Sequence, residues 1–275
     1  MIADFLQFLS AFLQTLPSLF PRFALAWIAS LVVLVLIFST AKRRIRERVT
    51  QMDEAMRFWA GGLRYRLRED LSTDRVWRTW FFRFWTNFAS APSLSTFSLL
   101  IPFWFAQSWL SANAGEMERA GNLARSPALH ALWREAAWLF PGLCYAGSML
   151  LSFVIKRYFK RQRPPREGKA FGYKLKDPSF PSGHSLTSFC FWLPLAFVVA
   201  QSGLLPFGAV VAFFLLAVTV VLLTGLSRVY LGVHFPSDVL GGYTIGIVWC
   251  AACYIAIGAL LRNGVIGGAY GIGGN

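Results

Sequence analysis

The sequence predicts an all-α polytopic membrane protein with a six-helix transmembrane core. Its composition is 56% hydrophobic and 16% aromatic, with a mean hydropathy of +0.49, which is too apolar for an ordinary soluble domain. Six apolar stretches have the length needed to cross a bilayer. The net charge of +14 comes from basic residues between these stretches, so a lipid bilayer is a better partner for them than nucleic acid.

The N-terminal third contains one core helix between two segments that favour the membrane surface. Residues 1–19 predict an interfacial helix, and the almost purely apolar residues 23–40 predict the first core helix. Residues 42–83 are strongly basic and helix-prone. Arginines alternate with aromatic residues over residues 75–88, which is typical of an amphipathic helix in the headgroup layer.

The other five core helices follow from the remaining apolar stretches. We expect them at residues 93–110, 136–155, 185–200, 207–226 and 236–261. The chain then divides into an N-terminal part (1–89), a core that carries the polar motifs (90–262) and a flexible, glycine-rich tail (263–275).

Three short polar stretches are the candidate functional motifs. They are Lys156 to Arg163-Pro164, then Pro181-Ser182-Gly183-His184, then Ser227-Arg228 with His234 and Asp238. Counted from the basic loop 42–83, the third helix ends, the fourth begins, the fifth ends and the sixth begins on one side of the membrane. The motifs lie at these four ends, so the sequence predicts that they form one site.

The residue types in these motifs suit a phosphate group. Lys156, Arg163 and Arg228 supply positive charge, and arginine donates to phosphate in bidentate fashion. Ser182 adds a hydroxyl donor. Gly183 allows close approach of a backbone that opens a helix, where N–H groups point outward.

The two motif histidines suit phosphoryl transfer. Asp238 follows His234 at i+4, so the carboxylate can accept from one ring nitrogen while the other nitrogen attacks phosphorus. His184 is then the candidate general acid for the leaving oxygen, and later the base that activates water.

Other interpretations of these residues remain open. Two histidines and a carboxylate can bind a metal, although the three nearby cations would repel a divalent ion. The four cysteines lie in apolar runs and are interpreted as small core residues. The other cations of the basic loop are interpreted as membrane anchors: Lys160, Arg161, Arg166, Lys169, Lys174 and Lys176.

The ordered motifs Lys-x6-Arg-Pro, Pro-Ser-Gly-His and Ser-Arg-x5-His-x3-Asp resemble the three-part signature of the type 2 phosphatidic acid phosphatase superfamily, over about residues 90–262. The resemblance implies a metal-independent membrane phosphatase without a cofactor. It carries catalytic roles to His234, His184 and Asp238, and phosphate-binding roles to Lys156, Arg163, Ser182, Gly183 and Arg228. Soluble vanadium haloperoxidases share this site, but six apolar spans disfavour that branch. Segment 42–83 is not part of the signature.

Three classes of function follow. The first is a phosphatase acting on a lipid phosphate or diphosphate, such as phosphatidate, phosphatidylglycerophosphate, a polyprenyl (di)phosphate or a lipid-linked sugar phosphate. The second is a lipid phosphotransferase that passes the phosphate to another lipid or sugar. The third is a non-catalytic membrane protein that binds anionic lipid, which the intact histidines disfavour. The sequence does not choose the lipid or the oligomeric state.

The expected location is a bacterial inner membrane, and two arguments disagree about the side that the site faces. The motif side has 22 Lys and Arg against five on the other side, which places it in the cytoplasm by the positive-inside rule. The family more often faces its site outward.

Overall fold

The computed structural model describes residues 21–38, 49–56, 58, 74–101, 104, 139–164, 177–202 and 205–262. Every regular element in this part of the chain is a helix, as expected. The predicted interfacial helix at 1–19, the tail after 262 and much of the basic segments lie outside the described residues. The helices are Pro21–Phe38, residues 49–56, α2 (Asp74–Asn87), Ala91–Ile101, α5 (Phe140–Phe159), α6 (Gly183–Ser202), α7 (Phe207–Tyr230) and α8 (Pro236–Arg262).

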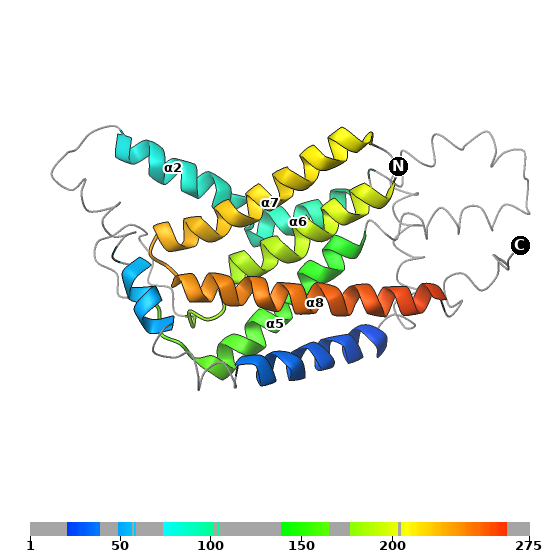
Figure 1. The fold of residues 1–275 in the computed structure, drawn as a ribbon, viewed down its shortest axis with the longest axis horizontal. Coiled ribbons are helices and arrows are strands. Elements are labelled where there is room, and N and C mark those ends of the chain that lie inside the picture. Colours follow the sequence, from blue (N-terminus) through cyan, green and yellow to red (C-terminus); the bar gives the residue numbers. More distant parts are fainter. Residues whose placement is uncertain are drawn as a thin grey trace, which may run out of the picture.

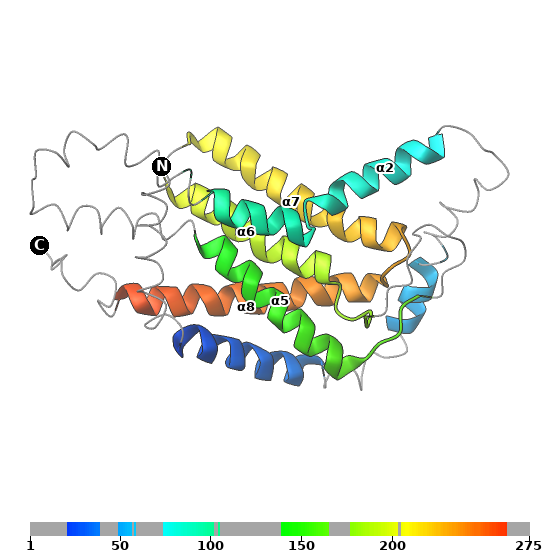
Figure 2. The same cartoon turned by 180° about the vertical axis from the view of Figure 1, so that it is seen from behind.

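Helix α6 lies at the centre of the bundle and packs against α5, α7 and α8 (Figures 1 and 2). Its interior positions are fully buried, including Leu186, Cys190 and Phe191. Small residues let the helices approach closely. A Cβ on Gly147 of α5 would lie 2.1 Å from the ring of Trp249 on α8, so only glycine fits there.

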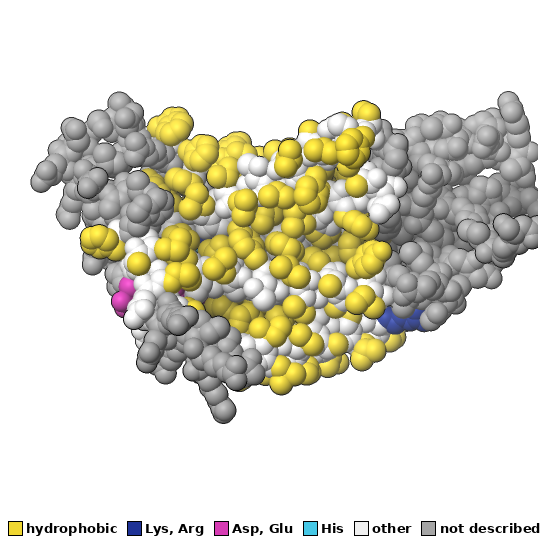
Figure 3. All heavy atoms as spheres, viewed as in Figure 1, with side chains coloured by type: hydrophobic (Ala, Val, Ile, Leu, Met, Phe, Trp, Pro, Cys, Tyr) yellow, Lys and Arg dark blue, Asp and Glu magenta, His cyan; other side chains and the backbone are white. Residues whose placement is uncertain are grey.

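The outer surface of the bundle is apolar over the middle of the described residues. Figure 3 shows hydrophobic side chains across this band, with charged side chains only toward its two ends. Within the described residues, four helices are long and apolar enough to cross a membrane: Pro21–Phe38, Gly183–Gln201, Phe207–Tyr230 and Pro236–Ala256. The chain is therefore an integral membrane protein.

The six-span core is only partly visible in the described residues. Helix α5 has twenty residues but carries Lys156 and Arg157 in its last turn, and it is not one of the four described helices that are long and apolar enough to cross a membrane. The second predicted span is described as a helix over Ala91–Ile101, which is shorter than a bilayer crossing. A core of six spans therefore stays a prediction.

The amphipathic helix expected between the first two core helices is α2. Its last two turns pack beside the last turns of α7, where Phe82 stacks on Tyr230 and the Thr86 and Ser227 hydroxyls lie 2.5 Å apart. Trp77 and Trp80 remain largely exposed on its other face. This pairing places the last turns of α2 against the end of α7, beside the third motif.

Four helix ends that carry the motifs lie at one end of the bundle (Figure 1). They are the end of α5, the start of α6, the end of α7 and the start of α8. Gly242 in α8 fixes this arrangement, because a Cβ there would lie 3.0 Å from the Ser182 carbonyl oxygen and 3.2 Å from the Leu186 nitrogen. The backbones of α6 and α8 thus approach each other closely beside His184 and one turn beyond Asp238.

Candidate active site

The turn between α7 and α8 presents His234. Arg228 lies in the last turn of α7, and its carbonyl accepts hydrogen bonds from the backbone nitrogens of Val233 (3.1 Å) and His234 (3.3 Å). Gly232 has a positive φ of 68°, which glycine adopts at little cost. The sequence thus folds the chain back so that His234, which is 4% exposed, faces into the end of the bundle.

The two nitrogens of the His234 ring face groups of opposite charge. Nδ1 lies 3.5 Å from Oδ2 of Asp238, which is longer than an ordinary hydrogen bond. Nε2 lies 3.3 Å from Nη1 of Arg163. Because a guanidinium can only donate, Nε2 must be the unprotonated nitrogen, and the proton belongs on Nδ1 facing the carboxylate.

The environment of His234 keeps its ring neutral at physiological pH. Burial lowers the pKa of His234 to about 4, and the positive charges of Arg163 and Arg228 act in the same direction. Asp238 opposes this shift without cancelling it. A neutral imidazole with a free electron pair on Nε2 is the form that a nucleophile requires.

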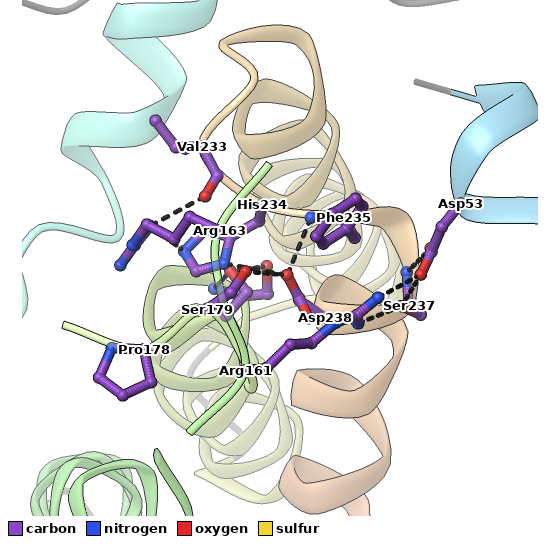
Figure 4. Close-up of polar contacts among 12 residues, drawn as sticks. Asp53, Arg161, Arg163, Pro178, Ser179, Val233, His234, Phe235, Ser237 and Asp238 are labelled. Carbon is purple, nitrogen blue, oxygen red and sulfur yellow. Dashed lines mark hydrogen bonds and ion pairs between the residues drawn. The ribbon is translucent and has the colours of Figure 1, made fainter. Parts of the chain in front are cut away.

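Asp238 is fully buried and is held through both carboxylate oxygens (Figure 4). Oδ2 accepts from the Ser179 hydroxyl and from the Phe235 backbone nitrogen at 2.8 Å. Oδ1 accepts from Nη1 of Arg161 at 2.7 Å. The carboxylate therefore has a fixed orientation beside His234.

The second motif opens α6 directly against α8. The Ser182 backbone nitrogen donates to the Asp238 carbonyl at 3.0 Å, and the Ser185 hydroxyl donates to the Ser182 hydroxyl at 2.9 Å. A Cβ on Gly183 would meet only the Ser152 hydroxyl, at 3.6 Å, so protein packing does not demand a glycine here. Close approach of a ligand to this backbone remains the predicted reason for it.

His184, in the first turn of α6, meets the predicted phosphate-binding cations. Its ring interacts electrostatically with Arg228, His234, Lys156 and Arg163, which come from the first and third motifs. Arg228 is 7% exposed and acts on both histidines. The structure thus brings together the eight residues that the sequence singled out.

Two of the cations predicted to bind phosphate already hold a carboxylate. Asp177 forms ion pairs with Nζ of Lys156 and, at 2.8 Å, with Nη2 of Arg163. Burial alone would raise the pKa of Asp177, but these two cations outweigh it and hold the pKa below its ordinary value. Sequence analysis missed this residue because a single aspartate in a basic loop belongs to no motif.

The interpretation of Arg161 as a membrane anchor is wrong. Its guanidinium bridges two buried carboxylates, Asp238 and Asp53, and lies 4.4 Å from the ring centre of Phe235 (Figure 4). In the sequence, Arg161 is one of several cations in a basic loop, beside Lys160 and Arg163, and nothing there distinguishes it as a partner of buried carboxylates. Asp53 comes from segment 42–83, to which the sequence assigned no role. No group of three or more metal-ligating side chains gathers within the described part of the chain.

The fold and this site define a helical integral membrane protein with a histidine–aspartate pair beside clustered cations. Residues 137–262 match the PAP2 superfamily, in agreement with the resemblance that the three motifs carry.

Curated relatives and a solved structure agree with this assignment. Phosphatidylglycerophosphatase B of Bacillus subtilis is 36% identical over 110 residues, which are 38% of this chain and 51% of that protein. Decaprenylphosphoryl-5-phosphoribose phosphatase of Mycobacterium tuberculosis is 32% identical over 116 residues, which are 41% of this chain and 57% of that protein. The chain thus spans about half the length of these relatives.

The fold is also similar to the crystal structure of a transmembrane PAP2-type phosphatidylglycerolphosphate phosphatase from Bacillus subtilis. The TM-score is 0.58 at 22% identity, over 85% of this chain and 96% of that chain.

Proposed function

We propose that this protein is a membrane lipid phosphate phosphatase that works through a phosphohistidine on His234. The observation that carries the proposal is the state of His234, whose neutral Nε2 points toward Arg163 while Nδ1 faces Asp238. The PAP2 domain and the phosphatase names of its relatives support the same class of reaction. No metal or cofactor is required by this scheme.

In the proposed first step, Nε2 of His234 attacks phosphorus, and the bond from phosphorus to the lipid oxygen breaks. Lys156, Arg163 and Arg228 hold the phosphate oxygens, helped by the Ser182 hydroxyl and the backbone N–H of Gly183. His184 gives its proton to the leaving oxygen, and Asp238 stabilises the positive charge that develops on His234.

In the second step, His184 takes a proton from water, and the water oxygen attacks phosphorus. The bond from phosphorus to Nε2 then breaks, which releases inorganic phosphate and restores the neutral histidine. Transfer to another lipid or sugar would use the same phosphohistidine with a hydroxyl group in place of water.

Phosphate release from a panel of lipid phosphates tests the proposal, with phosphatidate, phosphatidylglycerophosphate and polyprenyl phosphates in mixed micelles. We expect hydrolysis that a chelator does not change. His234→Ala should lower turnover by about four orders of magnitude or more, while the lipid phosphate still binds because the cations remain. Full activity in this variant would remove His234 as the nucleophile, and phosphate loss only with an added acceptor would favour the phosphotransferase.

A further inference from the structure

Asp53 is a buried carboxylate that the reaction scheme does not use. Its side chain is 1% exposed and accepts from the backbone nitrogen of Ser237 (3.0 Å), the Ser237 hydroxyl (2.5 Å) and Nη2 of Arg161 (2.6 Å). It comes from residues 49–56, which lie outside the residues matched to the family. Burying a carboxylate is costly, and the bonds from these three donors offset that cost.

Arg161 connects Asp53 to the proposed catalytic pair. One guanidinium nitrogen, Nη1, donates to Asp238 (2.7 Å) and to the Ser237 hydroxyl (2.7 Å), while Nη2 donates to Asp53. The planar guanidinium of arginine can donate to two carboxylates at once in a fixed geometry, whereas the compact ammonium of lysine is a point charge without that geometry. The result is an unbroken line of contacts from Asp53 through Arg161 and Asp238 to His234.

Asp53 also fixes the start of α8. Ser237 lies in the first turn of that helix, where backbone N–H groups lack partners within the helix. Asp53 accepts from one of these groups and, through Arg161, acts on the next residue, Asp238. Both contacts help to orient the Asp238 carboxylate, whose Oδ2 lies 3.5 Å from Nδ1 of His234.

We propose that Asp53 and Arg161 are positioning residues that hold Asp238 toward His234, so that Asp53 of the helix at residues 49–56 is a required part of the active site. This inference rests on the proposed function. It predicts that the pair supports the chemical step rather than lipid phosphate binding, because neither side chain belongs to the cations that surround His184.

The test compares Asp53→Asn and Arg161→Lys with wild type in the purified full chain, using phosphatidate and phosphatidylglycerophosphate in mixed micelles. We expect kcat to fall by about 10- to 100-fold, with KM within about twofold of wild type. Losses of this size are typical when a residue that orients a metal ligand through a hydrogen bond is replaced in other enzymes. Glu54→Gln is the matched control, because it removes the same charge from the neighbouring, exposed position and should not change kcat.

A double-mutant cycle separates positioning from a merely structural role. If Asp53 acts through Asp238, then Asp53→Asn should cause no further loss of kcat in an Asp238→Asn background. Multiplied losses, or an unchanged kcat in Asp53→Asn, would overturn the inference. If Asp53→Asn does not fold, Ser237→Ala replaces it in the same cycle, since it removes one contact to Asp53 and one to Arg161.

The two proposals fail in different ways. Activity that survives His234→Ala contradicts the proposed function and, with it, the role of Asp53. Loss of activity in His234→Ala, together with wild-type kcat in both Asp53→Asn and Arg161→Lys, contradicts the positioning role alone.

Discussion

Asp177 places a carboxylate against Lys156 and Arg163, two of the cations that we propose bind the substrate's phosphate. The Lys156 amine also donates to the Pro178 carbonyl at 3.0 Å, and Nε of Arg163 donates to the Asp177 carbonyl at 3.0 Å. A phosphate that binds here must therefore compete with Asp177 or share these donors with it. Since the Asp177 side chain is 49% exposed, its displacement into water is not costly.

We predict that Asp177→Asn strengthens binding of inorganic phosphate, the product of the proposed reaction. The variant removes a negative charge that repels phosphate and leaves the two cations available. A half-exposed ion pair contributes about 1 kcal/mol or less, so the inhibition constant of phosphate should fall by about fivefold at most. The measurement is product inhibition of phosphatidate hydrolysis, with Glu54→Gln as the control for loss of a distant charge. Weaker phosphate inhibition in Asp177→Asn would instead mean that the carboxylate orients the two cations for the ligand.

The contact between α6 and α8 is the element-scale feature that joins the second motif to the third. Both helices begin at the site, and Gly242 lets the backbone of α6 approach α8 one turn beyond Asp238. The hydrogen bond from the Ser182 nitrogen to the Asp238 carbonyl lies at the same crossing. The position of His184 relative to Asp238 is therefore set by helix packing rather than by a flexible loop.

We predict that Gly242→Ala lowers both stability and activity. The new methyl group would press on the backbone of α6 at Ser182 and Leu186, which cannot move as freely as a side chain end. Overpacking of this kind costs about 1–3 kcal/mol, and it should also lower kcat by moving the two histidines apart. Thermal unfolding in detergent and phosphate release measure the two effects.

The matched control is Gly208→Ala in the first turn of α7, where no atom lies within 4 Å of the added Cβ. This variant should keep wild-type activity and unfold at the same temperature or slightly higher, because alanine favours a helix. Equal behaviour of the two variants would contradict the packing argument.

Hydropathy predicted where helices lie better than where they end. The starts of α7 and α8 agree with the sequence prediction, but α7 continues through Arg228 to Tyr230, and α5 continues past Lys156 to Phe159. Apolar runs mark the part of a helix that lies in lipid, whereas the backbone stays helical for another turn beyond it. As a result, Lys156 and Arg228 belong to helix ends rather than to loops.

The candidate site was predictable where its residues recur in an ordered pattern of spacings, and not where they pair across the fold. The eight motif residues carried a recognisable order, and the structure brings them to one end of the bundle. Asp53, Arg161 and Asp177 are defined by tertiary contacts with partners 14 to 184 residues away, and nothing in their local sequence indicates such contacts. Arg161 was therefore interpreted as a membrane anchor from the basic composition of its loop alone.

The described residues present an apolar band on the face shown in Figure 3, and the helix ends that carry the site lie at one end of the bundle (Figure 1). By the sequence prediction, segments 42–83 and 156–176 lie on the side of the membrane that carries the motifs, which has 22 Lys and Arg against five on the other side. The cations that we propose to bind the substrate explain part of this excess, but the twelve in segment 42–83 are not motif residues. By the positive-inside rule, this surplus favours a site that faces the cytoplasm.

We predict that cysteines placed at Arg44 and Lys169 in the two basic segments react with a membrane-impermeant thiol reagent only after intact cells are permeabilised. Leu205→Cys is the matched control, because Leu205 is exposed in the turn between α6 and α7, at the opposite end of the bundle. It should react in intact cells. Three of the native cysteines are buried and the fourth, Cys250, is half-buried, so their background labelling should be low. Labelling of both basic segments in intact cells, with Leu205→Cys protected, would instead place the site outside the cytoplasm. The surplus of Lys and Arg would then be an exception to the positive-inside rule.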